Sequence, residues 1–140
     1  TVPVGTASRV ARVIKSNQKR PRDFDVVSNP EFLREGTAVK DFLEPDRVIV
    51  GLDNPRPRLR KTMETLYGGI TDTEHPLLFT NTRSAELIKY ASNAMLATRV
   101  SFMNEIARLC EKVGADVTEV ARGVGLDSRI GPRFLEAGVG

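Results

Sequence analysis

The sequence predicts an α/β fold, the C-terminal half of a doubly wound parallel-sheet domain followed by a long helix that starts a second, all-helical part. Through residues 1–81, short apolar segments that suit buried strands alternate with segments of helical periodicity, an order typical of a parallel sheet. Between Thr82 and the glycine at position 114 there is no other glycine and no proline, and apolar residues recur at helical spacing. This pattern predicts one helix of about 30 residues, roughly 45 Å long.

The individual elements follow from local patterns. Apolar runs bounded by proline, glycine or aspartate predict the strands, and apolar residues three and four apart predict the helices. The expected strands are 24–28, 46–51 and 77–80. Three helices are expected in this part. The first begins near Ala7, the second is short or irregular and lies within 31–41, and the third carries the apolar residues Leu59, Met63, Leu66 and Tyr67.

The second part of the chain is expected to be helical. A helix this long spans two domains or builds a dimer interface, because a domain of this size rarely buries such a helix alone. Asp116 and Glu119 resemble a capping box for a short helix that Gly123 and Gly125 end. We therefore place an incomplete sheet domain at 1–81 and an incomplete helical domain at 82–140.

The composition is that of a soluble globular protein, with 40% hydrophobic and 28% charged residues and a net charge of +3. No apolar run reaches membrane length. The basic clusters at 19–22 and 56–61 lack interleaved aromatic residues, which favours solvated surfaces over a nucleic-acid site. One cysteine, Cys110, excludes an internal disulfide and suits a reducing cytoplasm. No His or Cys pair has the spacing of metal ligands, so no metal is expected.

The two ends suggest an internal fragment. Residues 1–5 read as the exit of a strand whose body is missing, and residues 138–140 read as the start of a loop. The sequence also contains no G-x-G-x-x-G phosphate-binding turn and no P-loop.

The stretch from Ser28 to Gly36 is the first candidate site. It places Glu31 and Glu35 where a strand should end, and in open α/β sheets ligands bind outside the carboxyl ends of the strands. The two acids are four residues apart, so one helical turn would bring them to the same side. The alternative is a solvated acid pair at a helix N-terminus, which the helix dipole favours.

Lys89 and Asn93 are the second candidate site, four residues apart on the long helix. A desolvated lysine beside a carboxamide can stabilise a developing oxyanion. A surface lysine paired with an asparagine along the helix gives the same spacing, and spacing does not decide between the two.

Several segments together resemble one enzyme family across essentially the whole chain. The most specific is Asn-Pro-Glu-Phe-Leu-Arg-Glu-Gly at 29–36, and 127–135 resembles the UDP-glucose 6-dehydrogenase branch. The chain is identified on these residues as similar to the UDP-glucose/GDP-mannose dehydrogenase family. The other matching segments are 1–5, 45–48, 86–93, 104–106, 114–117 and 129–131.

The resemblance implies a Rossmann-like NAD-binding domain, a central dimerisation domain and an NAD-dependent enzyme of polysaccharide biosynthesis. Such an enzyme oxidises the C6 alcohol of UDP-glucose twice, through an aldehyde level and a cysteine thioester, to UDP-glucuronate. A homodimer or higher homo-oligomer through the long helix is implied, with no nucleic-acid or membrane partner.

The resemblance also implies a role for each matching residue. Glu31 would act as a base or water-positioning acid, with Lys89 and Asn93 at the oxyanion and the reacting carbon. Thr1 and Glu35 would lie at the nicotinamide end of NAD. The sugar nucleotide would contact the main chain of Phe32, Leu33, Arg34 and Glu35 and residues Phe134, Leu135, Glu136, Ala137 and Gly138. Arg129 would reach the sugar site of a neighbouring subunit.

The same resemblance places the nucleophilic cysteine in a block that follows the residues matched by 138–140. Cys110 is not at that position and suits a buried structural thiol. The 140-residue chain alone is therefore expected not to produce NADH from UDP-glucose. Two other interpretations stay open, a dehydrogenase for another nucleotide sugar such as GDP-mannose or UDP-N-acetylmannosamine, and a non-catalytic helical dimerisation module.

Overall fold

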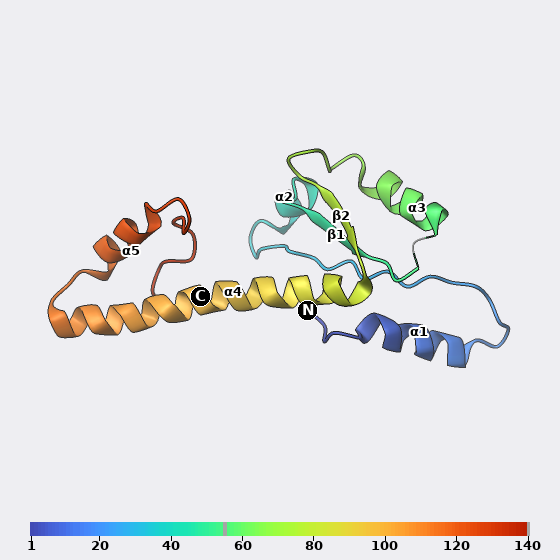
Figure 1. Cartoon of the computed structure of the whole chain (residues 1–140), viewed down its shortest axis with the longest axis horizontal. Coiled ribbons are helices and arrows are strands. Elements are labelled where there is room, and N and C mark those ends of the chain that lie inside the picture. Colours follow the sequence, from blue (N-terminus) through green and yellow to red (C-terminus); the bar gives the residue numbers. More distant parts are fainter. Residues whose placement is uncertain (55, 140) are drawn as a thin grey trace. The chain divides into compact units, whose positions relative to one another are not determined.

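The computed structural model of the chain describes residues 1–54 and 56–139 and divides into two compact units, Thr1–Tyr90 and Ala91–Gly140. Helix α4 (Thr82–Val113) belongs to both, because its first residues lie in the first unit and the rest in the second. The structure confirms the mixed α/β class and the single long helix that the sequence predicted, with 32 residues in α4 (Figure 1).

The first unit is built on two parallel strands. β1 (Val48–Gly51) pairs with β2 (Leu77–Thr80) in a register that sets Val48 opposite Leu77. Helix α3 (Pro57–Tyr67) connects them, which makes the β-α-β unit that parallel pairing requires. The core is apolar and centred on β1, and it consists of Val48, Val50, Leu52 and Met63 with Val27, Leu59, Tyr67, Leu77 and Phe79 packed around it.

The prediction of a strand at 24–28 is wrong, because these residues form no regular strand. Of residues 24–28, only Ser28 forms a bridge to another strand. This bridge is isolated and antiparallel, and in it Ser28 and Gly51 exchange backbone hydrogen bonds of 3.1 and 2.7 Å. The apolar composition was interpreted correctly, since Val27 packs on the core. A strand also needs a ladder of backbone partners, and apolar residues alone do not supply one.

Two further helices flank this unit. Helix α1 (Thr6–Asn17) forms where helical spacing predicted it, and its apolar residues Val10, Val13 and Ile14 are exposed. Helix α2 (Ala38–Leu43) is the only helical part of the segment 31–41 among the described residues, and it begins seven residues after Glu31. Glu31 and Glu35 therefore lie on a turn and not on a helix.

The start of α4 is locked against the end of β1. The Thr82 amide donates to Asp53 Oδ1 at 3.0 Å, and the Thr82 hydroxyl donates to Asp53 Oδ2 at 2.6 Å. Two hydrogen bonds to a carboxylate lower the pKa of Asp53. Ala85, in the first turn of α4, is fully buried. The beginning of α4 is thus a fixed part of the first unit.

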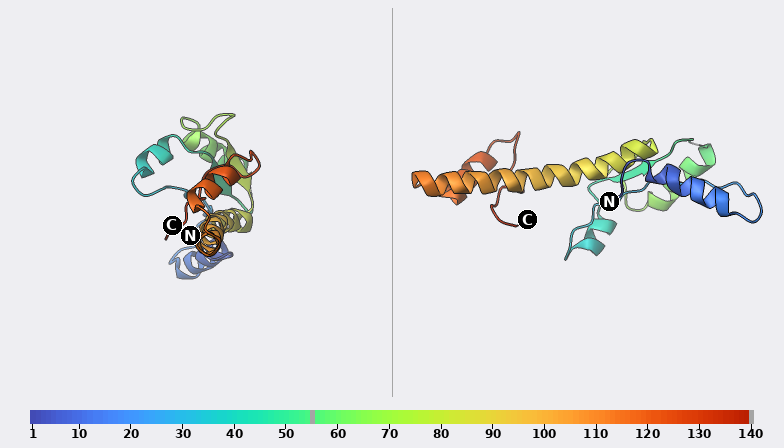
Figure 2. Two further views of the ribbon diagram at one scale, coloured as in Figure 1. Left: turned by 90° about the vertical axis from the view of Figure 1, so that its left-hand side faces the viewer. Right: turned by 90° about the horizontal axis from the view of Figure 1, so that it is seen from below.

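The second unit consists of the rest of α4, helix α5 (Val117–Gly125) and a tail that returns to α4 (Figure 2). Gly114 ends α4 at a φ of 72°, the left-handed conformation that glycine adopts without strain. The tail is tied down where the Arg99 guanidinium donates to the carbonyls of Ile130 and Gly131, at 3.1 and 2.9 Å. Met103, Cys110 and Leu135 are buried apolar residues of this unit.

Within the described ranges, no helix combines the length and the apolar character needed to cross a membrane.

Candidate active site

A pocket in the first unit brings together residues from three separated segments. It has a volume of about 370 Å³ and lies between the start of α1, the segment 26–31 and the first turns of α4. Its polar lining consists of Thr1, Thr6, Ser28, Asn29, Glu31, Glu86 and Lys89, and its apolar lining includes Val2, Val10, Val26 and Val27. Thr1, Glu31 and Lys89, which the sequence assigned to one site, therefore line the same pocket.

Glu31 and Lys89 form an ion pair in the lining of this pocket, with 3.4 Å between Lys89 Nζ and Glu31 Oε1. Lys89 is 8% exposed, whereas the Glu31 side chain is 59% exposed. The pKa of Glu31 is lowered, mainly because the Leu33 amide donates to its carboxylate at 2.7 Å and also because Lys89 is near. Glu31 is therefore held as an anion beside a buried cation, and Lys89 is not a solvated surface lysine.

The aromatic ring of Phe32 contacts two cations. The Arg47 guanidinium carbon lies 3.9 Å from the ring centroid, and Lys89 Nζ lies 5.1 Å from it. Both distances are within the range in which an aromatic ring attracts a cation. Phe32 therefore helps to hold the Lys89 ammonium group next to Glu31.

The turn that presents Glu31 is anchored by Asn29. The Asn29 amide nitrogen donates to the Ile49 carbonyl of β1 at 2.8 Å, and the Tyr67 hydroxyl of α3 donates to the Asn29 side-chain oxygen. Because Pro30 disfavours the helical conformation at Asn29, the chain turns at this point. The turn is thus fixed to β1 and α3 of the β-α-β unit.

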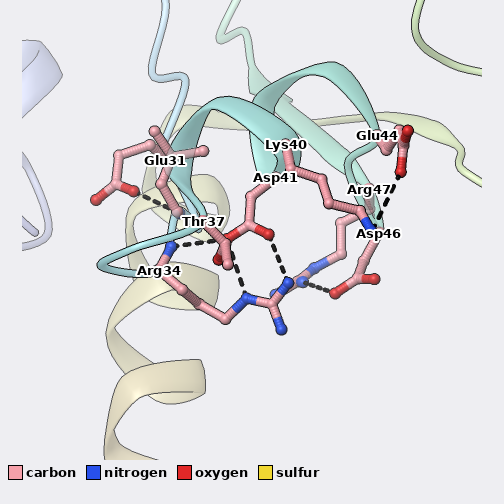
Figure 3. Close-up of polar contacts among 9 residues, drawn as sticks. Glu31, Arg34, Thr37, Lys40, Asp41, Glu44, Asp46 and Arg47 are labelled. Carbon is pink, nitrogen blue, oxygen red and sulfur yellow. Dashed lines mark hydrogen bonds and ion pairs between the residues drawn. The ribbon is translucent and has the colours of Figure 1, made fainter.

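Asp41 organises the loop that follows Glu31 (Figure 3). Its carboxylate accepts from the Arg34 amide at 2.8 Å, from the Arg34 guanidinium at 3.0 and 2.5 Å, and from the Thr37 hydroxyl at 3.1 Å. The hydrogen bonds from the Arg34 side chain are the main reason that the pKa of Asp41 is well below its usual range. Asp41 in turn raises the pKa of Arg34. The Asp41 carboxylate of α2 therefore holds the main chain at Arg34 and the side chains of Arg34 and Thr37.

Sequence reasoning missed two carboxylates that build this site, Asp41 and Glu86. Asp41 lies in a segment where only an irregular helix was expected. Glu86 is 2% exposed and accepts hydrogen bonds from two backbone amides of the Thr1–Tyr90 unit. An isolated acid in a helical sequence carries no signal of this role, because its partners are main-chain groups about eighty residues away.

The remaining predicted residues divide between the two units. Glu35 is exposed on the loop after Glu31. Asn93 lies one helical turn beyond Lys89 on α4, in the unit Ala91–Gly140. The convergence of Asn93 with Glu31 stays a prediction, as does the role of Glu35.

The predicted sugar-binding tail 134–138 has a defined conformation within the second unit. Phe134 has a φ of 61°, the left-handed region that residues other than glycine rarely adopt. Leu135 is buried, at 4% exposure. The Asn104 amide donates to the Gly138 carbonyl and its oxygen accepts from the Gly138 amide, both at 2.8 Å. Strained backbone held in place often marks binding sites.

Arg129 projects from the same tail. Its side chain is 87% exposed, and its guanidinium donates to Asp127 at 3.0 and 2.6 Å. Asp127 raises the pKa of Arg129, and Arg129 lowers the pKa of Asp127. The role predicted for Arg129 across a subunit interface stays a prediction.

The pocket lining combines apolar and polar groups that suit a ligand of mixed character. A nicotinamide has an apolar ring face and a carboxamide, and the pocket offers valine side chains together with the hydroxyls of Thr1 and Ser28. Among residues 1–54 and 56–139, no cluster of three His, Cys, Asp or Glu residues has the geometry to hold a metal ion.

Comparisons with known proteins identify the family of this chain. Residues 1–71 match the NAD binding domain, and residues 83–140 the central domain, of the UDP-glucose/GDP-mannose dehydrogenase family. The match to an NAD binding domain confirms the cofactor predicted from the sequence. The chain is 54% identical over its whole length to a UDP-glucose 6-dehydrogenase of Rhizobium meliloti, of which it spans 32%.

Two solved structures share the fold. A UDP-glucose dehydrogenase from Pyrobaculum islandicum is 42% identical with a TM-score of 0.90, and the match covers 100% of this chain and 31% of that protein. A GDP-mannose dehydrogenase from Pseudomonas aeruginosa is 34% identical with a TM-score of 0.78, and the match covers 91% of this chain and 29% of that protein. The chain thus spans about a third of the relatives it matches.

Proposed function

The chain belongs to the UDP-glucose/GDP-mannose dehydrogenase family, and on that premise we propose that it is part of an NAD-dependent UDP-glucose 6-dehydrogenase. The observation that supports this most is the Glu31–Lys89 pair, a buried ammonium group next to an anionic carboxylate in a pocket that also contains Thr1. The reaction would take the C6 alcohol to the carboxylate in two oxidations, and bound NAD⁺ would supply the hydride acceptor.

Each residue of the pair has work in such a reaction. Lys89, with Asn93, would stabilise the negative charge that develops on the C6 oxygen, an effect that a water-poor site strengthens. Glu31, held as an anion by the Leu33 amide, would accept a proton or orient water in the hydrolytic step. Cys110 is buried and is not proposed as the nucleophilic cysteine of the reaction.

Binding is assigned to two surfaces. Thr1 and Glu35 would hold the nicotinamide end of NAD. The Phe32–Glu35 main chain, which Asp41 bonds at Arg34, and the tail 134–138, which Asn104 bonds at Gly138, would hold UDP-glucose. We place the NAD-binding part at 1–81 and the central part at 82–140, and we infer a reducing, cytoplasmic location from the free Cys110.

The decisive test replaces the homologous third of the Rhizobium meliloti enzyme with this chain. We expect NADH formation that depends on UDP-glucose, and we expect Lys89→Met to lower kcat by about 100- to 1000-fold. Lys112→Met, at the exposed end of the same helix, is the matched control and should leave kcat unchanged. GDP-mannose and UDP-N-acetylmannosamine are tested in parallel, and faster turnover of either would replace the proposed substrate. The 140-residue chain alone should form no NADH.

Self-association through α4 is the second proposal. Met95, Phe102 and Leu109 are 64%, 56% and 53% exposed on this helix, an apolar surface that a second copy would cover. Sedimentation equilibrium of the 140-residue chain should show a dimer or larger oligomer, and Phe102→Glu should shift it toward monomer. A chain that is monomeric at all concentrations would contradict this proposal. It would also exclude the alternative interpretation of the chain as a non-catalytic dimerisation module.

A further inference from the structure

Glu86 is a buried carboxylate whose two oxygens are both used by the main chain of another helix. Oε2 accepts from the Gly5 amide at 2.6 Å, and Oε1 accepts from the Ala7 amide at 2.7 Å. These amides lie at the N-terminal end of α1, where helical backbone donors have no partner within the helix. Glu86 therefore ties the beginning of α1 to α4.

The residues on either side of this tie are those of the candidate site. Glu86 precedes Lys89 by three positions, so the two side chains share one face of α4. Gly5 closes the turn that follows Thr1, in which the Thr6 amide donates to the Pro3 carbonyl at 3.2 Å. Thr1, Glu86 and Lys89 all line the same pocket. A single helical turn thus joins the Thr1 side of the pocket to the lysine that faces Glu31.

The conformation of Gly5 makes this tie specific. Its φ of 97° is in the left-handed region, so the amide is aimed by a backbone shape that other residues adopt only under strain. The carboxylate then receives two donors from one short segment, Gly5 and Ala7. Removing one acceptor atom therefore frees an amide of the turn without removing any apolar packing.

We propose that Glu86 is a positioning residue that sets the Thr1–Ala7 segment against Lys89, and so places the nicotinamide end of the cofactor relative to the catalytic lysine. This inference rests on the proposed function. The alternative is that Glu86 only stabilises α1, as an anion near any helix N-terminus does. If Glu86 only stabilises α1, then Glu86→Gln lowers the stability of the protein and leaves the Michaelis constants unchanged.

The first measurement is amide hydrogen exchange in the 140-residue chain. Glu86→Gln keeps one oxygen for one amide and turns an NH₂ group toward the other. We expect exchange at Gly5 or Ala7 to rise by about 10- to 100-fold, the factor expected for losing one hydrogen bond to a charged group. Glu111→Gln, an exposed glutamate on α4, is the control. Unchanged exchange at both amides would overturn the tie.

The second measurement is steady-state kinetics of the Rhizobium chimera, at a temperature where circular dichroism shows each variant to be folded. Glu86→Gln should raise the KM for NAD⁺ about tenfold and leave the KM for UDP-glucose within about twofold. An active parent chimera whose KM for NAD⁺ does not respond to Glu86→Gln would overturn the positioning role alone. An inactive parent chimera would instead contradict the proposed function.

Discussion

Gly51 is the residue where the structure predicts the largest effect for the smallest change, an added methyl group. It ends β1 against the first turn of α4. A Cβ at this position would lie 2.7 Å from Ala85 Cβ, 2.9 Å from Thr82 Cα and 3.0 Å from the Asn81 carbonyl oxygen. Optimal carbon–carbon contacts are about 3.5–4.0 Å, so α4 and β1 would have to separate by about 1 Å. The Asp53–Thr82 hydrogen bonds and the fully buried Ala85 oppose that movement.

We therefore expect Gly51→Ala to lower the free energy of unfolding by about 3 kcal/mol, the upper end of the cost of overpacking. Urea denaturation should show a midpoint lowered by about 1–3 M at an unchanged slope. Tyrosine fluorescence follows the first unit specifically. Both tyrosines of the chain, Tyr67 and Tyr90, lie in Thr1–Tyr90, and the chain contains no tryptophan to mask them.

Gly69→Ala is the matched control, because a Cβ there meets nothing within 4 Å. It should leave the midpoint unchanged or raise it, since alanine restricts the unfolded chain. A Gly51→Ala protein as stable as the Gly69→Ala protein would refute the reasoning, and would mean that β1 and the start of α4 are not in the close contact described.

Three further predictions concern the loops of the site. Asn29→Ala removes bonds to Ile49 and Tyr67 and should cost about 1–2 kcal/mol by urea denaturation, whereas a change below about 0.3 kcal/mol would contradict the anchoring role. Asp41 has a lowered pKa when folded, so its contribution is present above the unfolded value of about 3.9 and is lost as pH falls through the folded value. The stability difference between the parent and Asp41→Asn should accordingly shrink below about pH 4, and a difference independent of pH would reject it. Asn104→Ala should speed amide exchange at Gly138 by about tenfold, with no change expected for Asp23→Asn.

Much of the site could be predicted from local sequence, but only in part from physical reasoning. Glu31 was assigned a role through the resemblance of the motif at 29–36, whereas spacing alone favoured a solvated acid pair. The structure shows Lys89 to be 8% exposed and 3.4 Å from Glu31, so it is not a solvated surface lysine, while its catalytic role stays a prediction. Burial depends on what packs against a residue, and for Lys89 the nearest partner is fifty-eight positions away in sequence, at Glu31.

The sequence by itself determined the helices and the two paired strands, because hydrophobic periodicity and the punctuation by glycine and proline are local properties. The sequence did not determine that residues 24–28 would lack a ladder of backbone hydrogen bonds to a neighbouring strand, because such pairing depends on residues distant in the chain. Only the tertiary structure revealed Asp41 and Glu86 as the side chains that hold the loop and the Thr1 turn in place. The partners of Glu86 are backbone amides, which every residue but proline carries, so no pattern of side chains indicates its role. Asp41 pairs with Arg34 seven positions earlier, at a spacing that no regular helix or strand predicts.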